Sequence, residues 1–113
     1  VLQVLVNLIQ NAKYALREAN RPDKQLAVRI RLVGDRTVQV VVADNGVGIA
    51  SENLARIFAH GFTTRKKGHG FGLHASALAA REMGGDLKAQ SDGPNHGAIF
   101  ILELPLLTKD QAP

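Results

Sequence analysis

The segment Gly68-His69-Gly70-Phe71-Gly72-Leu73 places three glycines at alternate positions, directly before an alanine-rich run, 75–82, that is typical of a helix. Glycines allow backbone N–H groups to come close to a ligand, and the start of a helix favours negative charge. Phosphate is therefore the ligand that this pattern suits best. Taken alone, the same glycines would also fit a plain surface turn.

A second glycine-bearing segment follows a run of β-branched residues. The run 38–43 is typical of a largely buried strand, and it ends at Asp44-Asn45-Gly46-Val47-Gly48-Ile49. The chain does not return as a hairpin partner, because 51–57 begins with a serine cap and is predicted to form a short helix. A carboxylate at a strand end, between glycines that clear space, can accept a hydrogen bond from an exocyclic amino group. Adenine carries an exocyclic amino group at the ring position where guanine carries a carbonyl oxygen. Asp44 is therefore a candidate for distinguishing the two bases.

Residues 1–19 are predicted to form an amphipathic helix with two distinct faces. The apolar face carries Leu2, Leu5, Leu8, Ile9, Ala12 and Leu16 at the three-four spacing of a core-facing stripe. The polar face carries Gln3, Asn7, Gln10, Asn11 and Tyr14. Two amides one turn apart could hold phosphate oxygens or Mg²⁺, which takes oxygen ligands and keeps several waters. The alternative is an ordinary solvated helix face.

The rest of the sequence predicts strands that alternate with helices. Strands are predicted near 26–33, 37–43, 86–91 and 97–104, and a helix over 71–83 that stops at Gly84-Gly85. Residues 108–113 are typical of a frayed, flexible tail. Pairs of strands that alternate with helices predict an α+β two-layer sandwich, with the helices packed on one face of a mixed sheet.

In order and spacing, these segments resemble the ATP-binding catalytic domain of two-component sensor histidine kinases, within the superfamily that includes gyrase, Hsp90 and MutL. The similar motifs are the N box at 7–12, the first glycine box at 44–49, the F box at 57–58 with 61–64, the second glycine box at 68–73, and the closing segment at 84–87, 97–100 and 104–105. The resemblance covers almost the whole chain, 1–113, and implies a Bergerat-type ATP-binding fold. It also implies that 58–70 forms a lid over the nucleotide.

The resemblance implies that ATP and Mg²⁺ are the cofactors and assigns them a set of residues. The implied nucleotide-binding residues are Asn7, Asn11, Tyr14, Asp44, Gly46, Gly48, Ile49, Thr63, Thr64, Arg65, Lys66, Lys67, Gly68, His69, Gly70, Phe71, Gly72 and Leu73. Asn11 is also the implied Mg²⁺ ligand. The cations of Arg65-Lys66-Lys67 would meet the phosphates from the lid. No residue is assigned a catalytic role.

Three departures from the family pattern stand out. Tyr14 occupies a position where the family often has a lysine that contacts phosphate, and Lys13 lies on a different helix face. Ala98 stands where a hydroxyl residue is common, which would remove a water-mediated contact near the base. Relatives also have a strand before the N-box helix, so we expect this chain to be an N-terminally truncated part of a longer protein.

The resemblance also indicates the reaction. Relatives that hydrolyse ATP carry a glutamate as general base where this chain has Asn7, and an amide cannot take a proton. Transfer of the γ-phosphoryl group to a histidine is therefore predicted. The four histidines, His60, His69, His74 and His96, lack metal-site spacing and a following acidic residue, so the acceptor is expected on a separate domain. A serine kinase of the anti-sigma type, or a nucleotide-binding scaffold without transfer, remains the alternative.

Composition fits this interpretation. A chain of 113 residues with 45% hydrophobic content suits one domain with a core. The net charge of +4 is dispersed and its basic residues do not interleave with aromatic ones, so nucleic acid is not an expected partner. The absence of cysteine permits a reducing cytoplasm, and no apolar stretch approaches the length of a membrane span. We expect a cytoplasmic domain, whose parent could be membrane-anchored. The expected partners are the parent's phosphoacceptor domain and a response regulator, with the parent a homodimer.

Overall fold

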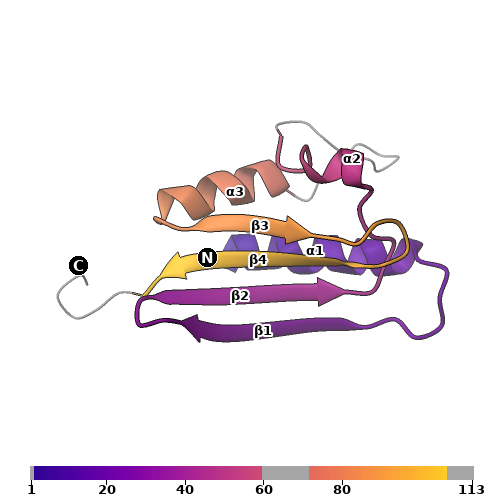
Figure 1. The fold of residues 1–113 in the computed structure, drawn as a ribbon, viewed down its shortest axis with the longest axis horizontal. Coiled ribbons are helices and arrows are strands. Elements are labelled where there is room, and N and C mark those ends of the chain that lie inside the picture. Colours follow the sequence, from indigo (N-terminus) through magenta and orange to yellow (C-terminus); the bar gives the residue numbers. More distant parts are fainter. Residues whose placement is uncertain (1, 60–71, 107–113) are drawn as a thin grey trace.

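The computed structural model describes residues 2–59 and 72–106 of the chain. Its elements, in chain order, are α1 (Leu2–Glu18), β1 (Leu26–Val33), β2 (Thr37–Asp44), α2 (Ser51–Leu54), α3 (Leu73–Glu82), β3 (Asp86–Gln90) and β4 (Ala98–Pro105) (Figure 1). The predicted helices and strands are all present, and only α2 is clearly shorter than expected. A four-residue helix cannot be stable by itself, so its position depends on tertiary contacts.

The helices and the sheet form two layers. The strands are arranged in the order β1-β2-β4-β3, and α1 and α3 lie on the same side of the sheet (Figure 1). Helix α1 packs against β2 and α3, whereas α3 also packs against β3 and β4. The predicted α+β two-layer architecture is therefore confirmed.

The described sheet is antiparallel throughout, where a mixed sheet was expected. Strand β4 pairs antiparallel with β2 on one side and with β3 on the other. Strands β2 and β3 consequently run in the same direction, as expected for strands joined through a helix. They are not neighbours, however, because β4 returns through the space between them. The insertion of β4 replaces a parallel pairing with two antiparallel ones.

The core lies between the inner face of the sheet and the two long helices. Its largest fully buried apolar side chains are Phe100, Leu8, Leu102 and Val42. On α1 the buried stripe runs through Val4, Leu8 and Ala12, whereas Leu2, predicted to face the core, is 74% exposed. The buried stripe is turned toward the polar face of the helix because α1 packs against α3 as well as the sheet.

The turn after α3 depends on close backbone packing. A Cβ atom at Gly85 would overlap the carbonyl oxygen of Glu103 on β4. The predicted Gly84-Gly85 stop signal therefore ends the helix and also brings β3 into register beside β4. Within the described ranges, no helix has the length and apolar character needed to cross a membrane.

Truncation of two leucines compares the part of the inner sheet face that the helices cover with the part that they leave exposed. Leu102 on β4 is fully buried, whereas Leu32 on β1 is 66% exposed. We expect Leu102→Ala to lower the free energy of unfolding by about 2–5 kcal/mol, because it leaves a cavity in the core. Leu32→Ala should cost about 0.5 kcal/mol or less. Urea unfolding of both variants tests this, and similar losses would contradict the described packing.

Candidate functional site

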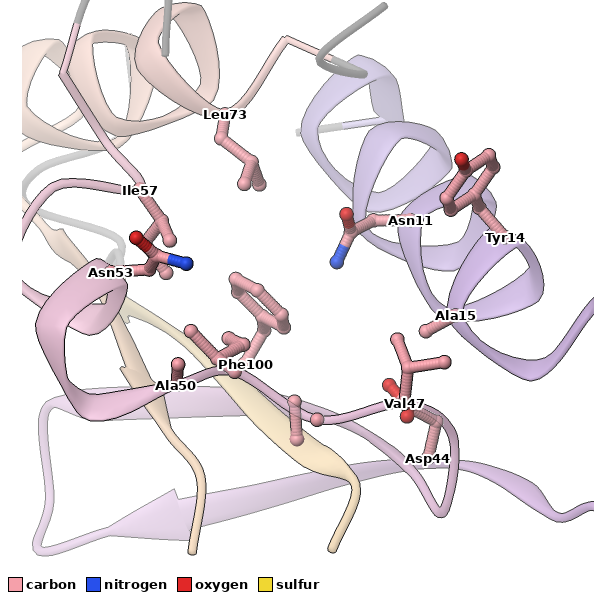
Figure 2. A pocket seen from close by; sticks show the side chains of 13 residues that line it. Asn11, Tyr14, Ala15, Asp44, Val47, Ala50, Asn53, Ile57, Leu73 and Phe100 are labelled. Carbon is pink, nitrogen blue, oxygen red and sulfur yellow. The ribbon is translucent and has the colours of Figure 1, made fainter. Parts of the chain in front are cut away.

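A cavity of about 120 Å³ lies between α1, the segment that follows β2 and the start of α3 (Figure 2). This volume is roughly ten times what one water molecule needs, so a planar organic ring can enter. Its lining residues are Asn11, Tyr14, Ala15, Asp44, Val47, Gly48, Ile49, Ala50, Asn53, Ile57, Leu73, Ala98 and Phe100. An apolar wall with a few separate polar groups is typical of a small-molecule site.

Asp44 supplies the carboxylate of the cavity. It is the last residue of β2, and its Oδ1 atom accepts a hydrogen bond of 2.8 Å from the Gly46 N–H. Its Oδ2 atom is buried and has no hydrogen-bond partner within the described part of the chain. Burial raises the pKa of this carboxyl, and the backbone N–H groups of Gly46 and Ala98 offset part of the effect. A buried acceptor without a donor is costly, so a ligand that donates to Oδ2 would be stabilised here.

Asn45 holds the end of β2 in place from the side away from the cavity. Its Nδ2 group donates to the Asp23 carbonyl at 2.8 Å, and its Oδ1 atom accepts from the Gln25 N–H at 2.7 Å. Arg21 donates from Nη1 to the Asn45 carbonyl at 2.9 Å. Asn45 therefore ties the connection between α1 and β1 to the strand end that carries Asp44. In the sequence it looked only like part of a turn, because its partners lie about twenty residues away.

The glycines beside Asp44 serve chain packing more than ligand access. A Cβ atom at Gly46 would lie 2.6 Å from the carbonyl carbon and oxygen of Ala15 on α1. Gly48 has φ +74°, and its Cβ atom would overlap the Gly93 carbonyl oxygen. Gly48 lines the cavity, whereas Gly46 does not. The glycines were expected to clear space for a ligand, but the space beside Gly46 is filled by α1.

The two amides of the predicted polar stripe on α1 have different surroundings. Asn11 is 7% exposed and lines the cavity together with Tyr14. Asn7 lies outside the lining, where its Nδ2 group donates to the Ser76 hydroxyl at 3.0 Å and its Oδ1 atom accepts from Gln3 at 3.0 Å. Asn7 therefore joins α1 to α3. The regular spacing of the stripe did not reveal this division, because it depends on where α3 packs.

An apolar wall closes the cavity opposite α1. Phe100 projects from β4 toward the cavity (Figure 2), and its ring meets that of Phe58 edge to face, with centroids 6.3 Å apart. His74 donates from Nδ1 to the Phe58 carbonyl at 2.9 Å, since a carbonyl can only accept. This bond ties the first turn of α3 to the segment after α2. Alternation along β4 could have placed Phe100 on the inner face, but it could not have placed it in the site.

The predicted nucleotide-binding residues of the lid and of the second glycine box lie mostly outside the described ranges. Thr63, Thr64, Arg65, Lys66, Lys67, Gly68, His69, Gly70 and Phe71 are not among the described residues. Gly72, with φ +67°, caps the start of α3, and a Cβ atom there would lie 2.7 Å from the Asn7 side-chain nitrogen. Leu73 lines the cavity, as does Ile49 from the first glycine box.

Comparison with known proteins identifies the family. Residues 1–108 match the family model for the histidine kinase-, DNA gyrase B- and HSP90-like ATPases, and the chain belongs to this family. It is 38% identical over 104 residues to the sensor histidine kinase ZraS of Klebsiella oxytoca, covering 92% of this chain and 21% of that protein. It is 41% identical over 115 residues to the two-component sensor PprA of Pseudomonas aeruginosa, covering 97% of this chain and 12% of that protein. The chain thus spans about a fifth or less of the length of these two relatives.

Solved structures agree with this assignment. The catalytic domain of histidine kinase ThkA superposes with a TM-score of 0.71 at 32% identity, covering 91% of this chain and 64% of that one. Full-length ShkA in complex with AMPPNP gives a TM-score of 0.75 at 26% identity, covering 94% of this chain and 21% of that one. The predicted resemblance to histidine kinase catalytic domains is confirmed.

The buried carboxyl predicts a pH dependence of stability without ligand. Because its pKa is raised in the folded protein, Asp44 contributes stability that is present below the unfolded pKa of about 3.9 and is lost as the pH rises through the folded value. We expect the free energy of unfolding of the unsubstituted protein to fall relative to Asp44→Asn between about pH 4 and pH 7. Urea unfolding of both proteins at both pH values measures this, and a change of opposite sign would contradict it.

Proposed function

We propose that this domain binds ATP with its adenine against Asp44 and delivers the γ-phosphoryl group to a histidine on another domain of the same protein. The observation that carries the proposal is the buried Asp44 Oδ2 atom of the cavity lining, which has no hydrogen-bond donor among residues 2–59 and 72–106. It rests also on membership of a family whose matched relatives are named as sensor histidine kinases and two-component sensors.

Asp44 favours adenine over guanine for a simple reason. A carboxylate only accepts hydrogen bonds, and adenine presents an amino group where guanine presents a carbonyl oxygen. Two acceptors facing each other in a buried site would leave both without a donor. The apolar side chains of Ile49, Leu73 and Phe100 offer surfaces against which a purine ring can pack.

The described residues suit Mg²⁺ that is held mainly by its nucleotide. They contain no cluster of three His, Cys, Asp or Glu side chains that could form a metal cage. Mg²⁺ usually keeps several waters and binds through phosphates with only one or two protein oxygens. The amide of Asn11, buried in the cavity wall, can supply one such oxygen. Mg²⁺ would neutralise phosphate charge during transfer.

The surroundings of Asn7 favour transfer over hydrolysis. Its amide is engaged by Gln3 and Ser76, and an amide cannot act as a general base toward water. We place the acceptor histidine on a separate domain of a homodimeric parent, with a response regulator downstream and this domain in the cytoplasm. A serine kinase and a scaffold without transfer activity are the competing functions, and each predicts a different outcome below.

Nucleotide titrations test the base assignment. We expect ATP and ADP to bind and GTP to bind much more weakly, and Asp44→Asn to lose about 1.5–3 kcal/mol of ATP affinity, the range for hydrogen bonds to charged groups. Calorimetry with each nucleotide measures this. Asp92→Asn, at an exposed carboxylate in the connection between β3 and β4, is the matched control and should bind normally. Equal affinity for ATP and GTP would contradict the assignment of Asp44 to the adenine amino group.

Transfer in trans tests the reaction. With γ-labelled ATP, the chain alone should neither label itself nor hydrolyse ATP appreciably. With the parent's histidine-bearing domain added, an acid-labile, base-stable label should form slowly on that domain, because tethering no longer raises the effective concentration. Asn11→Ala should reduce this labelling at a fixed Mg²⁺ concentration. Strong ATPase activity of the chain alone, or phosphoserine on the partner, would overturn the histidine kinase function. ATP binding without transfer to any partner would favour the scaffold.

A further inference from the structure

Asn53 brings a polar group to a part of the cavity wall that is otherwise apolar. It belongs to α2 and lines the cavity beside Ala50 and Ile57. Its amide points into the cavity, on the side facing Asn11 of α1 (Figure 2). A polar group directed into a ligand cavity is well placed to orient the ligand.

Arg56 determines which end of this amide faces the cavity. Its Nη2 group lies 3.0 Å from Asn53 Oδ1. A guanidinium group can only donate, so the atom that it contacts must be the amide oxygen, and the usual ambiguity between oxygen and nitrogen is removed. The Arg56 N–H also donates to the Asn53 carbonyl at 2.8 Å, which holds the two residues in one turn. The Nδ2 group is consequently the end that faces the cavity, as Figure 2 shows.

The donor of Asn53 complements groups already present on the other side of the cavity. Asp44 can only accept, and we have placed it against the adenine amino group. Asn53 lies across the cavity from α1 (Figure 2). It can donate through Nδ2, because its side-chain hydrogen bond among the described residues is made by Oδ1. The remaining hydrogen-bonding groups of adenosine can all accept, namely the unsubstituted ring nitrogens and the sugar oxygens, although the sugar hydroxyl groups can also donate. A neutral amide donor matches such an acceptor better than it matches a charged phosphate.

From this geometry we propose that Asn53 is a further nucleotide-binding residue, whose Nδ2 group donates a hydrogen bond to a ring nitrogen or a sugar hydroxyl oxygen of bound adenosine. The assignment rests on the proposed ATP-binding function and adds to it a contact from α2. It gives Arg56 a positioning role, because its bond to Oδ1 keeps the donor turned inward. The pair also links the short helix α2 directly to the ligand.

Two variants of Asn53 and a neighbouring control test the contact. Asn53→Ala should weaken ATP binding by roughly three- to tenfold, the effect of one neutral hydrogen bond. Asn53→Asp keeps the shape but replaces the donor with an acceptor, so it should weaken binding at least as much. Glu52→Gln, at an exposed position of the same helix outside the cavity lining, should bind ATP normally. Calorimetry gives the affinities, and thermal unfolding shows whether each variant is folded.

Nucleotide analogues identify the acceptor. The probes are 1-deaza-ATP, 3-deaza-ATP, 7-deaza-ATP, 2′-deoxy-ATP and 3′-deoxy-ATP, each lacking one candidate acceptor atom. The analogue that lacks the true acceptor should bind the unsubstituted protein more weakly than ATP does, and Asn53→Ala should cause no further loss with it. The other analogues should still lose affinity in Asn53→Ala. A role of Asn53 in shaping α2 alone would instead weaken all probes equally.

The outcomes separate this inference from the proposed function. If Asn53→Ala and Asn53→Asp bind ATP like the unsubstituted protein while Asp44→Asn does not, the Asn53 contact is wrong and the ATP site stands. Equal losses with every analogue would also overturn the contact. If the unsubstituted protein binds no ATP, the proposed function fails and this inference fails with it.

Discussion

Immediately after β2, the backbone packs closely between α1 and the connection from β3 to β4, and the rest of the structure depends on this packing. Gly46 lies against the backbone of Ala15, and Gly48 lies against the Gly93 carbonyl. A side chain at either position would force these segments apart, and at Gly48 the positive φ adds strain for any other residue. This close packing holds the strand end that carries Asp44 under α1. The burial of its carboxylate follows from that position.

The cavity combines a few polar groups with an apolar wall, and the polar groups come from three different elements. Asp44 comes from the end of β2, Asn11 and Tyr14 from α1, and Asn53 from α2. Because an acceptor lies on one side and an oriented donor on another, a ligand must match both to bind well. Burial raises the pKa of Asp44 and so opposes its ionisation in the absence of a ligand. Donation from an adenine amino group would favour the charged form and reverse that effect.

Two side-chain hydrogen bonds hold the start of α3, and both involve residues from distant parts of the sequence. Asn7 donates to Ser76, and His74 donates to the Phe58 carbonyl. The bond from Asn7 joins α1 to α3, and the bond from His74 joins α3 to the segment after the short helix α2. These bonds place Leu73 in the cavity wall. Polar residues in a nucleotide-binding motif therefore divide between holding the site and facing the ligand.

The helices, the strands, the glycine-rich turn after β2 and the place of Asp44 at a strand end could all be predicted from the sequence. Periodicity, caps and turn residues act over a few positions, so they can be recognised without knowing which segments meet. The tertiary structure was needed to show that β4 lies between β2 and β3 and that Asn7 faces α3 while Asn11 faces the cavity. It was also needed to show that Phe100 and Asn53 line the cavity. Each of these depends on contacts between segments far apart in the chain, and local spacing carries no information about which distant partner a side chain will meet.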